Sequence, residues 1–280
     1  EIQDEVAILK GHAARDPLED VQPVCTPEQL EDEFRKCLEL AIFMLKTLGL
    51  YEDVSYRFSQ WDPNDRAKYI GTEEQWNEAQ GLMERILNHL EIPYEIGIGE
   101  AAFYGPKLDI QIKNVYGKED TLITIQIDQM LAKQFGMVYT DKDGKQKTPC
   151  IIHRTSIGCY ERTLALLIEK YAGAFPLWLA PVQVKLLPIA DRHLDYLYEV
   201  KKQLEDKGFR CEVDDRSEKI GYKIREAQLE KVPYMVVVGD KDIENNTISI
   251  RKRKEGDLGA MTVEQFLEKI VPDRDNKVID

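Results

Sequence analysis

The stretch IIHRTSIGCYERTLALLIEKYAGAFPLWLAP, from Ile151 to Pro181, is the part of the sequence that decides the fold. It begins with apolar residues and turns at Gly158. Four apolar residues then follow at helical spacing: Leu164, Leu167, Ile168 and Tyr171. Gly173 and Pro176 end the helical pattern. The stretch therefore predicts a strand, a tight turn and a helix.

One arginine has an unusual place in this pattern. Arg162 falls in the first turn of the predicted helix, where the helix dipole favours anions and mildly disfavours a cation. An arginine there, next to a glycine turn, could face a bound phosphate. An ordinary strand-to-helix connection with a surface arginine is the simpler interpretation of the spacing alone.

The bulk properties predict an intracellular protein of two domains. The chain has 280 residues, of which 43% are hydrophobic and 32% charged. It has neither an apolar run of the ~20 residues that span a bilayer nor a signal-like start, so we expect a soluble, cytoplasmic protein with no membrane partner. The first residue is Glu and not Met, which suggests a fragment or a processed product.

Cysteine number and net charge exclude some classes of protein. The five cysteines are odd in number and lack C-x-x-C spacing, which argues against a disulfide framework and a self-contained cysteine zinc site. A net charge of −13 argues against a general nucleic-acid coat but leaves a local basic site open. Residues 184–280 carry 19 Lys and Arg against 21 Asp and Glu, so the acidity lies mainly in the earlier part.

The part before the quoted stretch predicts two helices and several short strands. Residues 1–24 show no sustained period and stay unassigned. A helix is predicted up to Gly49, with Thr26 as its N-cap and Pro27 at its first position. A second helix is predicted over 72–90. Period-2 segments at 55–59, 94–98, 108–113 and 122–128 predict strands of an antiparallel sheet.

Polar residues occur on these predicted strands where a structural strand would not need them. Gln126 and Asp128 share one strand face, and Asp109, Gln111 and Lys113 share another. A functional face and an ordinary solvated face are both open interpretations. The loop over 99–107 holds Tyr104 and Lys107 among glycines and a proline, which allow the backbone to approach a ligand closely.

After Pro181 the pattern changes to alternating strands and helices. Strands are predicted at 184–190, 210–214, 234–239 and 247–251, and helices at 192–207, 219–231 and 262–270. This alternation predicts an α/β domain with a largely parallel sheet. The expected divisions are 1–24, 25–182 and 183–280. The basic run from Arg251 to Lys254 fits either a solvated edge strand or an RNA contact.

Several motifs together resemble the class II aminoacyl-tRNA synthetases in their threonyl form. His153–Gly158, Glu161–Arg162 and the run to Pro181 resemble motif 3 of that class. Further matches, in order and separation, are Trp61–Pro63, Lys68–Gly71, Ala102–Asp109 and Thr124–Asp128. The resemblance covers roughly residues 25–280. It implies a partial class II catalytic domain of α+β type, built on an antiparallel sheet, followed by an α/β anticodon-binding domain.

The resemblance also implies roles for individual residues. Arg162 would bind the ATP phosphates, Tyr104 and Lys107 would contact threonine or the adenylate, and Gln126 would line the same pocket. His153 would be one of three ligands of a zinc ion, although a lone histidine near a strand end is more often a satisfied structural residue.

The second domain resembles the anticodon-binding domain shared by several class II synthetases. The residues that carry this likeness are Ser217–Gln228 and Val232–Asp242. It implies that Asp242 and Arg251 read anticodon bases, since a carboxylate acceptor and a guanidinium donor suit base edges in single-stranded loops.

Two of the family's elements have no counterpart in the sequence. These are motif 1, which builds the homodimer interface, and motif 2, whose arginine grips the α-phosphate. Residues 13–24 stand where the motif 2 loop is expected, just before Cys25. The other two zinc ligands belong to the missing part, and neither His12 nor Cys25 is expected to replace them.

Three functions remain open at this stage. The first is a threonine–tRNA ligase that uses ATP and Mg²⁺ and acts on tRNA-Thr. The second is a catalytically inactive, truncated fragment that binds tRNA or regulates. The third is a synthetase for a related amino acid that shares the anticodon domain; His153 and the loop Ala102–Lys107 favour threonine over it.

Overall fold

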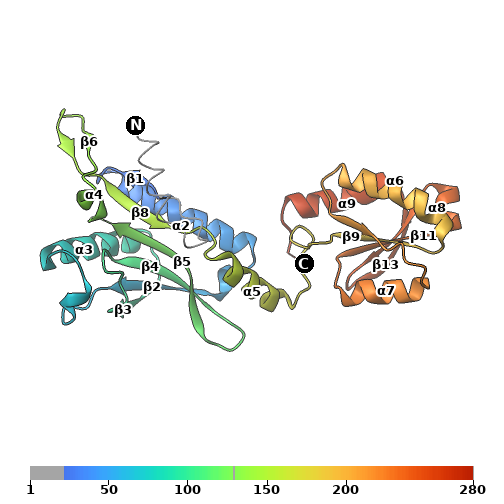
Figure 1. Cartoon of the computed structure of the whole chain (residues 1–280), viewed down its shortest axis with the longest axis horizontal. Helices are drawn as coiled ribbons and strands as arrows, with labels where there is room; N and C mark the ends of the chain where they lie inside the picture. Colours follow the sequence, from blue (N-terminus) through green and yellow to red (C-terminus); the bar gives the residue numbers. More distant parts are fainter. Residues whose placement is uncertain (1–21, 129, 280) are drawn as a thin grey trace. The chain divides into compact units, whose positions relative to one another are not determined.

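The computed structural model describes residues 22–128 and 130–279. The chain divides into two compact units, with the division after Leu166 (Figure 1). Each unit has its own sheet and its own core. The expectations for residues 1–21, including a short strand or helical turn near the start, lie outside the described residues.

The first unit is built on a six-stranded sheet in the order β1-β8-β5-β4-β2-β3. Its strands are β1 (Val24–Cys25), β2 (Val54–Gln60), β3 (Tyr94–Ile98), β4 (Lys107–Lys113), β5 (Glu119–Asp128) and β8 (Cys150–Arg154). All neighbours pair antiparallel except β2 and β3, which are parallel. The antiparallel expectation was therefore wrong for β3, because a helix connects β2 to β3 and such a crossover brings strands side by side in the same direction.

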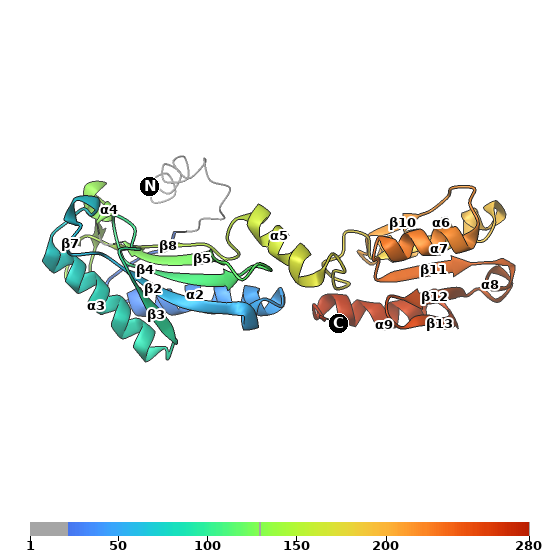
Figure 2. The same cartoon turned by 90° about the horizontal axis from the view of Figure 1, so that it is seen from below.

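Helices α2 (Leu30–Thr47) and α3 (Glu73–His89) lie on the same side of this sheet (Figure 2). Helix α3 begins as predicted, because the Thr72 side chain accepts from the backbone N–H of Gln75. Helix α2 begins three residues later than predicted. Residues 26–29 form a turn instead, in which the N–H of Gln29 donates to the Thr26 carbonyl at 3.0 Å.

The two faces of the sheet differ in polarity. The face that packs on the helices carries fully buried apolar side chains: Phe58, Leu108, Ile110, Ile125, Ile127 and Ile152. The alternate positions of the same strands carry polar side chains: Ser59, Lys107, Asp109, Thr124, Gln126, Asp128 and His153. Because strand side chains alternate, one pattern creates both the core and a continuous polar face.

The quoted stretch forms the predicted strand, turn and helix. Strand β8 is followed by Gly158, at φ +78°, and by α5 (Tyr160–Tyr171). A Cβ on Gly158 would lie 2.1 Å from the carbonyl oxygen of Leu122 on β5, so only glycine fits where the turn meets the sheet. The predicted apolar face was partly wrong: Leu167 is buried as predicted, but Leu164 and Ile168 are exposed, and Thr163 and Leu166 are buried in their place.

The remaining elements of the first unit are short. They are the 3₁₀ turns Tyr51–Asp53 and Arg66–Lys68, helix α4 (Leu131–Gln134), and the hairpin of β6 (Tyr139–Thr140) and β7 (Gln146–Lys147). Trp61 and Trp76 stack with ring centroids 5.6 Å apart and form a small aromatic core next to α4.

The second unit has a five-stranded sheet in the order β10-β9-β11-β12-β13. Its strands are β9 (Val184–Pro188), β10 (Cys211–Val213), β11 (Tyr234–Val238), β12 (Ile248–Lys252) and β13 (Gly256–Met261). The first three are parallel, whereas β12 and β13 are antiparallel additions. The sheet is therefore mixed and not largely parallel. Strand β12 is not an edge strand, because β13 covers it.

Helices cover both faces of this sheet. Helices α6 (Leu194–Glu205) and α9 (Val263–Asp275) lie on one side and α7 (Ile220–Leu229) on the other, with α8 (Asp240–Asn245) after β11 (Figure 1). Val236 and Ile250 face the larger core with α6 and α9, and Met235 and Val237 face α7. A 3₁₀ turn, Asp191–His193, precedes α6. In the described part of the chain, no helix is long and apolar enough to cross a membrane.

Candidate functional site

A row of polar side chains crosses four strands of the first unit. His153 on β8 is opposite Gln126 on β5, Gln126 is opposite Lys107 on β4, and Lys107 is opposite Ser59 on β2. Side chains at opposed positions of an antiparallel pair lie on the same face, about 5 Å apart at Cβ. The register therefore places three of the predicted site residues next to one another.

The row is reinforced by a buried carboxylate. Asp109 is 1% exposed and accepts hydrogen bonds from Ser59 Oγ at 2.6 Å and Thr124 Oγ1 at 2.7 Å. The ammonium group of Lys107 also donates to Asp109. A buried carboxylate is tolerated when its oxygens are satisfied in this way. Asp109 therefore fixes the direction of Lys107. The sequence analysis had noted Asp109 only as an unexplained polar residue.

The loop before β4 closes over one end of the row. The Tyr104 ring lies edge-on to His153, with ring centroids 5.4 Å apart. The Gln126 side-chain amide donates to the Gly105 carbonyl at 3.0 Å. A Cβ on Gly105 would lie 2.4 Å from the carbonyl oxygen of Ile127, so a side chain would displace the loop. Tyr104, Gln126 and His153 thus meet at one place.

His153 is held from behind by a second buried carboxylate. Its Nε2 lies 2.9 Å from Oδ2 of Asp128, which has no exposed surface. The other oxygen of Asp128 accepts the backbone N–H groups of Met130 at 2.8 Å and Leu131 at 2.9 Å. Asp128 therefore orients the imidazole and also begins α4. Its place two residues after Gln126, on the same strand face, was the signal for this role.

Arg162 lies apart from this group. It is exposed, and its guanidinium donates to the carbonyl oxygen of Thr121 near the start of β5. Gln126 is five positions after Thr121, which corresponds to about 17 Å along an extended strand. The structure therefore places Arg162 and His153 towards opposite ends of β5.

In the second unit the two predicted base-reading residues have different surroundings. Asp242 in α8 is buried, and its carboxylate accepts from the Gly239 N–H at 3.0 Å and from Ser249 Oγ at 2.9 Å. Arg251, two residues after Ser249 on β12, has Nη1 3.6 Å from Oδ2 of Asp257. Asp242 is thus already used in holding α8 to β12, whereas the Arg251 side chain is partly exposed.

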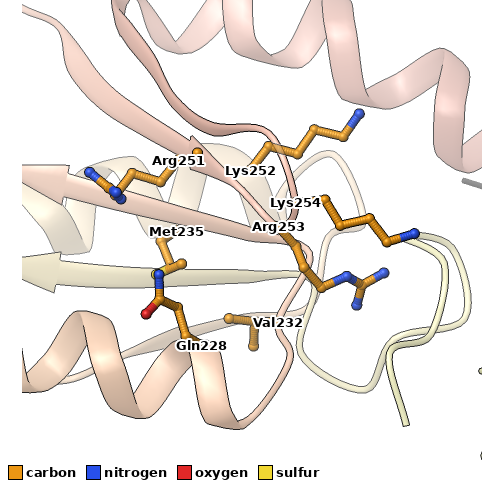
Figure 3. Close-up of a pocket in the computed structure, with 8 residues that line it drawn as sticks. Gln228, Val232, Met235, Arg251, Lys252, Arg253 and Lys254 are labelled. Carbon is orange, nitrogen blue, oxygen red and sulfur yellow. The ribbon is translucent and has the colours of Figure 1, made fainter. Parts of the chain in front are cut away.

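Arg251 lines a pocket of about 330 Å³ (Figure 3). The lining combines a basic strand end with one amide and two apolar side chains: Gln228, Val232, Met235, Arg251, Lys252, Arg253, Lys254 and Gly256. The basic run leaves the sheet after Lys252, so Arg253 and Lys254 lie in the turn before β13 and not on a strand. Arg253 donates to the carbonyl oxygens of Lys231 and Phe175, and Lys252 pairs with Glu255. Arg251, beside the apolar side chains of the lining, suits a flat anionic ligand such as a nucleotide.

The described residues do not form a metal centre. Between residues 22 and 279, leaving out 129, no group of three or more His, Cys, Asp or Glu is placed to hold a metal ion. Burial raises the pKa of the Cys25 thiol to about 12 and also raises that of its cross-strand neighbour Cys150. Burial therefore disfavours the thiolate form of both side chains, which is the form that ligates metals.

Two family models match successive parts of the chain. The family described as "tRNA synthetase class II core domain (G, H, P, S and T)" matches residues 18–171, and the family described as "Anticodon binding domain" matches residues 183–272. The first match covers more than half of the chain.

The similar curated relatives are threonine–tRNA ligases. A threonine–tRNA ligase from Clostridium perfringens is 59% identical over 254 residues, which is 91% of this chain and 40% of that protein. One from Geobacillus kaustophilus is 44% identical over 257 residues, covering 91% and 39% respectively. The chain thus spans about 40% of the length of these relatives.

Solved structures agree on the fold. A structure described as the RNA binding domain of threonyl-tRNA synthetase from Cryptosporidium parvum matches with a TM-score of 0.82 at 31% identity, covering 91% of this chain and 63% of that one. A putative threonyl-tRNA synthetase from Aeropyrum pernix, at 24% identity and a TM-score of 0.74, shows the fold alone. From the matched families and the order of the two matches along the chain, we conclude that the chain belongs to the class II aminoacyl-tRNA synthetases, and its similar curated relatives are threonine–tRNA ligases.

Proposed function

We propose that this chain supplies a large part of the amino-acid site and the anticodon-binding unit of a threonine–tRNA ligase. The observation that carries the proposal is the row His153–Gln126–Lys107 on a buried polar sheet face, with Tyr104 over it. Its proposed reaction begins with attack of the threonine carboxylate on the ATP α-phosphate. The products are threonyl-adenylate and pyrophosphate, and a hydroxyl group at the 3′ end of tRNA-Thr then takes the threonyl group and releases AMP.

Each residue of the site has a proposed role. Tyr104, Lys107 and Gln126 contact threonine or the adenylate at one end of β5, where Lys107 is already oriented by Asp109. Arg162 binds ATP phosphates at the other end. Mg²⁺ would arrive with ATP, held mainly by the phosphates, because Asp109 and Asp128 are committed to protein donors. A tRNA ligase of this kind would act in the cytoplasm.

The proposed domains follow the same division. Residues 25–182 would form the partial catalytic domain and residues 183–280 the anticodon-binding domain. Homodimer formation is a property of the whole synthetase, and for this chain it can be measured directly by light scattering.

Threonine-dependent exchange of labelled pyrophosphate into ATP tests the first half-reaction. We expect exchange that depends on threonine and falls by about 10²-fold or more in Arg162→Ala, since a cation at the phosphates stabilises the transition state. A chain that folds correctly yet shows no exchange would contradict adenylate formation by this chain alone.

The pocket in the second unit favours a second candidate function. A compact unit with a basic pocket at Arg251 could bind tRNA whether or not the first unit catalyses the reaction. The chain would then be a catalytically silent tRNA-binding or regulatory fragment. It would bind tRNA-Thr but show no exchange, which separates the two candidates.

Arg251→Ala is expected to weaken binding of tRNA-Thr by about 5- to 150-fold, corresponding to the ~1–3 kcal/mol of one base-reading arginine. Arg251→Lys keeps the charge but loses the planar fork, so it should recover only part of the affinity. Filter binding or fluorescence anisotropy at fixed salt measures both variants.

Lys202→Ala provides the matched control for Arg251. Lys202 is an exposed cation on α6, where it pairs with Asp206 at 3.0 Å. Its loss should change affinity by less than about twofold, because it removes only a screened surface charge. Equal losses in Arg251→Ala and Lys202→Ala would mean that the unit binds RNA through general charge and not through the pocket.

A further inference from the structure

The family resemblance implies a zinc ion at His153, but the described residues around His153 do not fit one. Catalytic zinc takes three protein ligands and keeps one open position. The described residues supply one such ligand at most: Nε2 of His153 faces Asp128, which leaves Nδ1, and no group of three or more His, Cys, Asp or Glu is placed with it among them. Asp128 lies on the Nε2 side of the ring, where its carboxylate also accepts from the N–H groups of Met130 and Leu131, so it orients the imidazole and adds no second ligand beside Nδ1.

Cys25, on the strand that pairs with β8, does not complete the site. Cys25 is opposite Cys150 in the register of β1 and β8, and Val24 is opposite Ile151. Alternation along β1 therefore puts Cys25 on the helix-covered face and its neighbours Val24 and Gln22 on the polar face. Cys25 is 6% exposed, and its thiol has the raised pKa described above.

The residue opposite His153 is Gln22, which has a side-chain amide. The N–H of Ile152 donates to the Pro23 carbonyl at 2.9 Å, so the next opposed pair along β1 and β8 is Gln22 and His153. The Oε1 atom of Gln22 is buried and has no hydrogen-bond partner. A buried carbonyl oxygen without a donor is unfavourable, and a donor group of a ligand would satisfy it.

Asp128 also decides what the imidazole can offer. Because Asp128 accepts at Nε2, the neutral ring carries its proton there and presents Nδ1 as an acceptor. The two groups left for a ligand are therefore both acceptors, Nδ1 of His153 and Oε1 of Gln22.

We propose that this end of the polar face binds a hydrogen-bond donor of the ligand directly, without zinc, between His153 and Gln22. The donor would be the ammonium or hydroxyl group of an amino acid, with Tyr104 forming the side of the pocket. This inference rests on the proposed amino-acid site, but the zinc content that tests its first half needs no substrate.

The first measurement is the zinc content of the whole chain after equilibration with zinc and removal of the excess. We expect far less than one zinc per chain, and no change in His153→Asn. Gln22→His places a second imidazole opposite His153 and is expected to increase the retained zinc. About one zinc per chain in the unchanged protein, lost in His153→Asn, would overturn the inference while leaving the proposed function intact.

The second measurement is binding of L-threonine by calorimetry, with and without a chelator. We expect the same affinity in both conditions and a loss of about tenfold in Gln22→Leu, which removes the acceptor but keeps the side-chain volume. L-valine, which lacks the hydroxyl, and N-acetyl-L-threonine, which lacks the ammonium, identify the donor: at least one should bind about tenfold more weakly.

Gln146→Leu is the control for loss of an amide, because Gln146 is exposed on the β6–β7 hairpin. It should leave threonine binding unchanged. Binding abolished by the chelator, or equal in Gln22→Leu and the unchanged chain, would overturn direct recognition. A chain without zinc that also fails to bind threonine would overturn recognition at this site and, with it, the proposed amino-acid site.

Discussion

Gly158→Ala is expected to destabilise the first unit by about 3 kcal/mol or more. An L-residue at φ +78° costs about 1–2 kcal/mol. The added Cβ would also lie 2.1 Å from the carbonyl oxygen of Leu122, which is backbone within a central strand and cannot move aside cheaply. The turn must therefore withdraw from β5, and the bond from Arg162 to Thr121 should break with it. Hydrogen exchange of β5 and β8 across a urea series measures the loss.

Gly117→Ala separates conformational strain from the collision. Gly117 has nearly the same φ, +75°, but a Cβ there meets nothing within 4 Å. Its replacement should cost only about 1 kcal/mol. If Gly158→Ala and Gly117→Ala cost the same, the close approach of the motif 3 turn to β5 would be refuted.

Asp109→Ala is expected to cost the first unit about 3–5 kcal/mol. The change removes the carboxylate that accepts from Ser59, Thr124 and Lys107. It leaves the Lys107 ammonium group on a buried sheet face without its carboxylate partner. Lys107 should also lose its fixed direction, so ATP–pyrophosphate exchange should fall more than unfolding of the chain explains. The free energy of unfolding is obtained from urea unfolding followed by hydrogen exchange of β4. The activity is obtained from ATP–pyrophosphate exchange at low urea.

Ser59→Ala is the matched control for Asp109. It removes one of the three donors and leaves Asp109 with Thr124 and Lys107, so the expected loss is only about 1 kcal/mol. A loss in Asp109→Ala no greater than in Ser59→Ala would show that the carboxylate is solvated and does not organise the row.

The sequence predicted most of the first sheet because its strands alternate over most of their length. The segments around Asp109 and Gln126 have isoleucine and leucine at every second position, so period 2 located β4 and β5. The same alternation could have revealed the polar row. What it could not supply was the order of strands, since local pattern carries no information on which strands pair. The parallel placement of β3 beside β2 therefore had to come from the structure.

Other elements escaped prediction for local reasons. Strand β13 contains Gly256 and Gly259 and exposes most of its side chains, so it has neither the composition nor the pattern of a strand. It forms because its backbone pairs with that of β12. Helix α8 is only six residues long, too short for helical periodicity to show. The partnership of Asp128 with His153 joins positions 25 residues apart, which spacing alone does not reveal.

Recognition of the family assigned roles that the geometry qualifies. His153 is where the expected zinc ligand stands, yet its surroundings consist of an engaged carboxylate and the Gln22 amide. Asp242 was expected to read a base, but its carboxylate is already shared between Gly239 and Ser249. A motif gives the residue type at a position, whereas its available atoms depend on neighbours that the motif does not include.

Strand β5 joins Arg162, through the Thr121 carbonyl, to Gln126 and Asp128 at its other end. The length of the strand therefore sets the distance between the two ends of the site. Leu122 is already an extra residue in β5, at the irregularity opposite Ile110 and Gln111 of β4. Beyond it, losing Ile125 would shorten the strand by about 3.4 Å and turn every later side chain to the opposite face. Such a change would bring Ile127 into the site and Asp128 into the core, so the spacing between the two ends of the site depends on the number of residues in this part of β5.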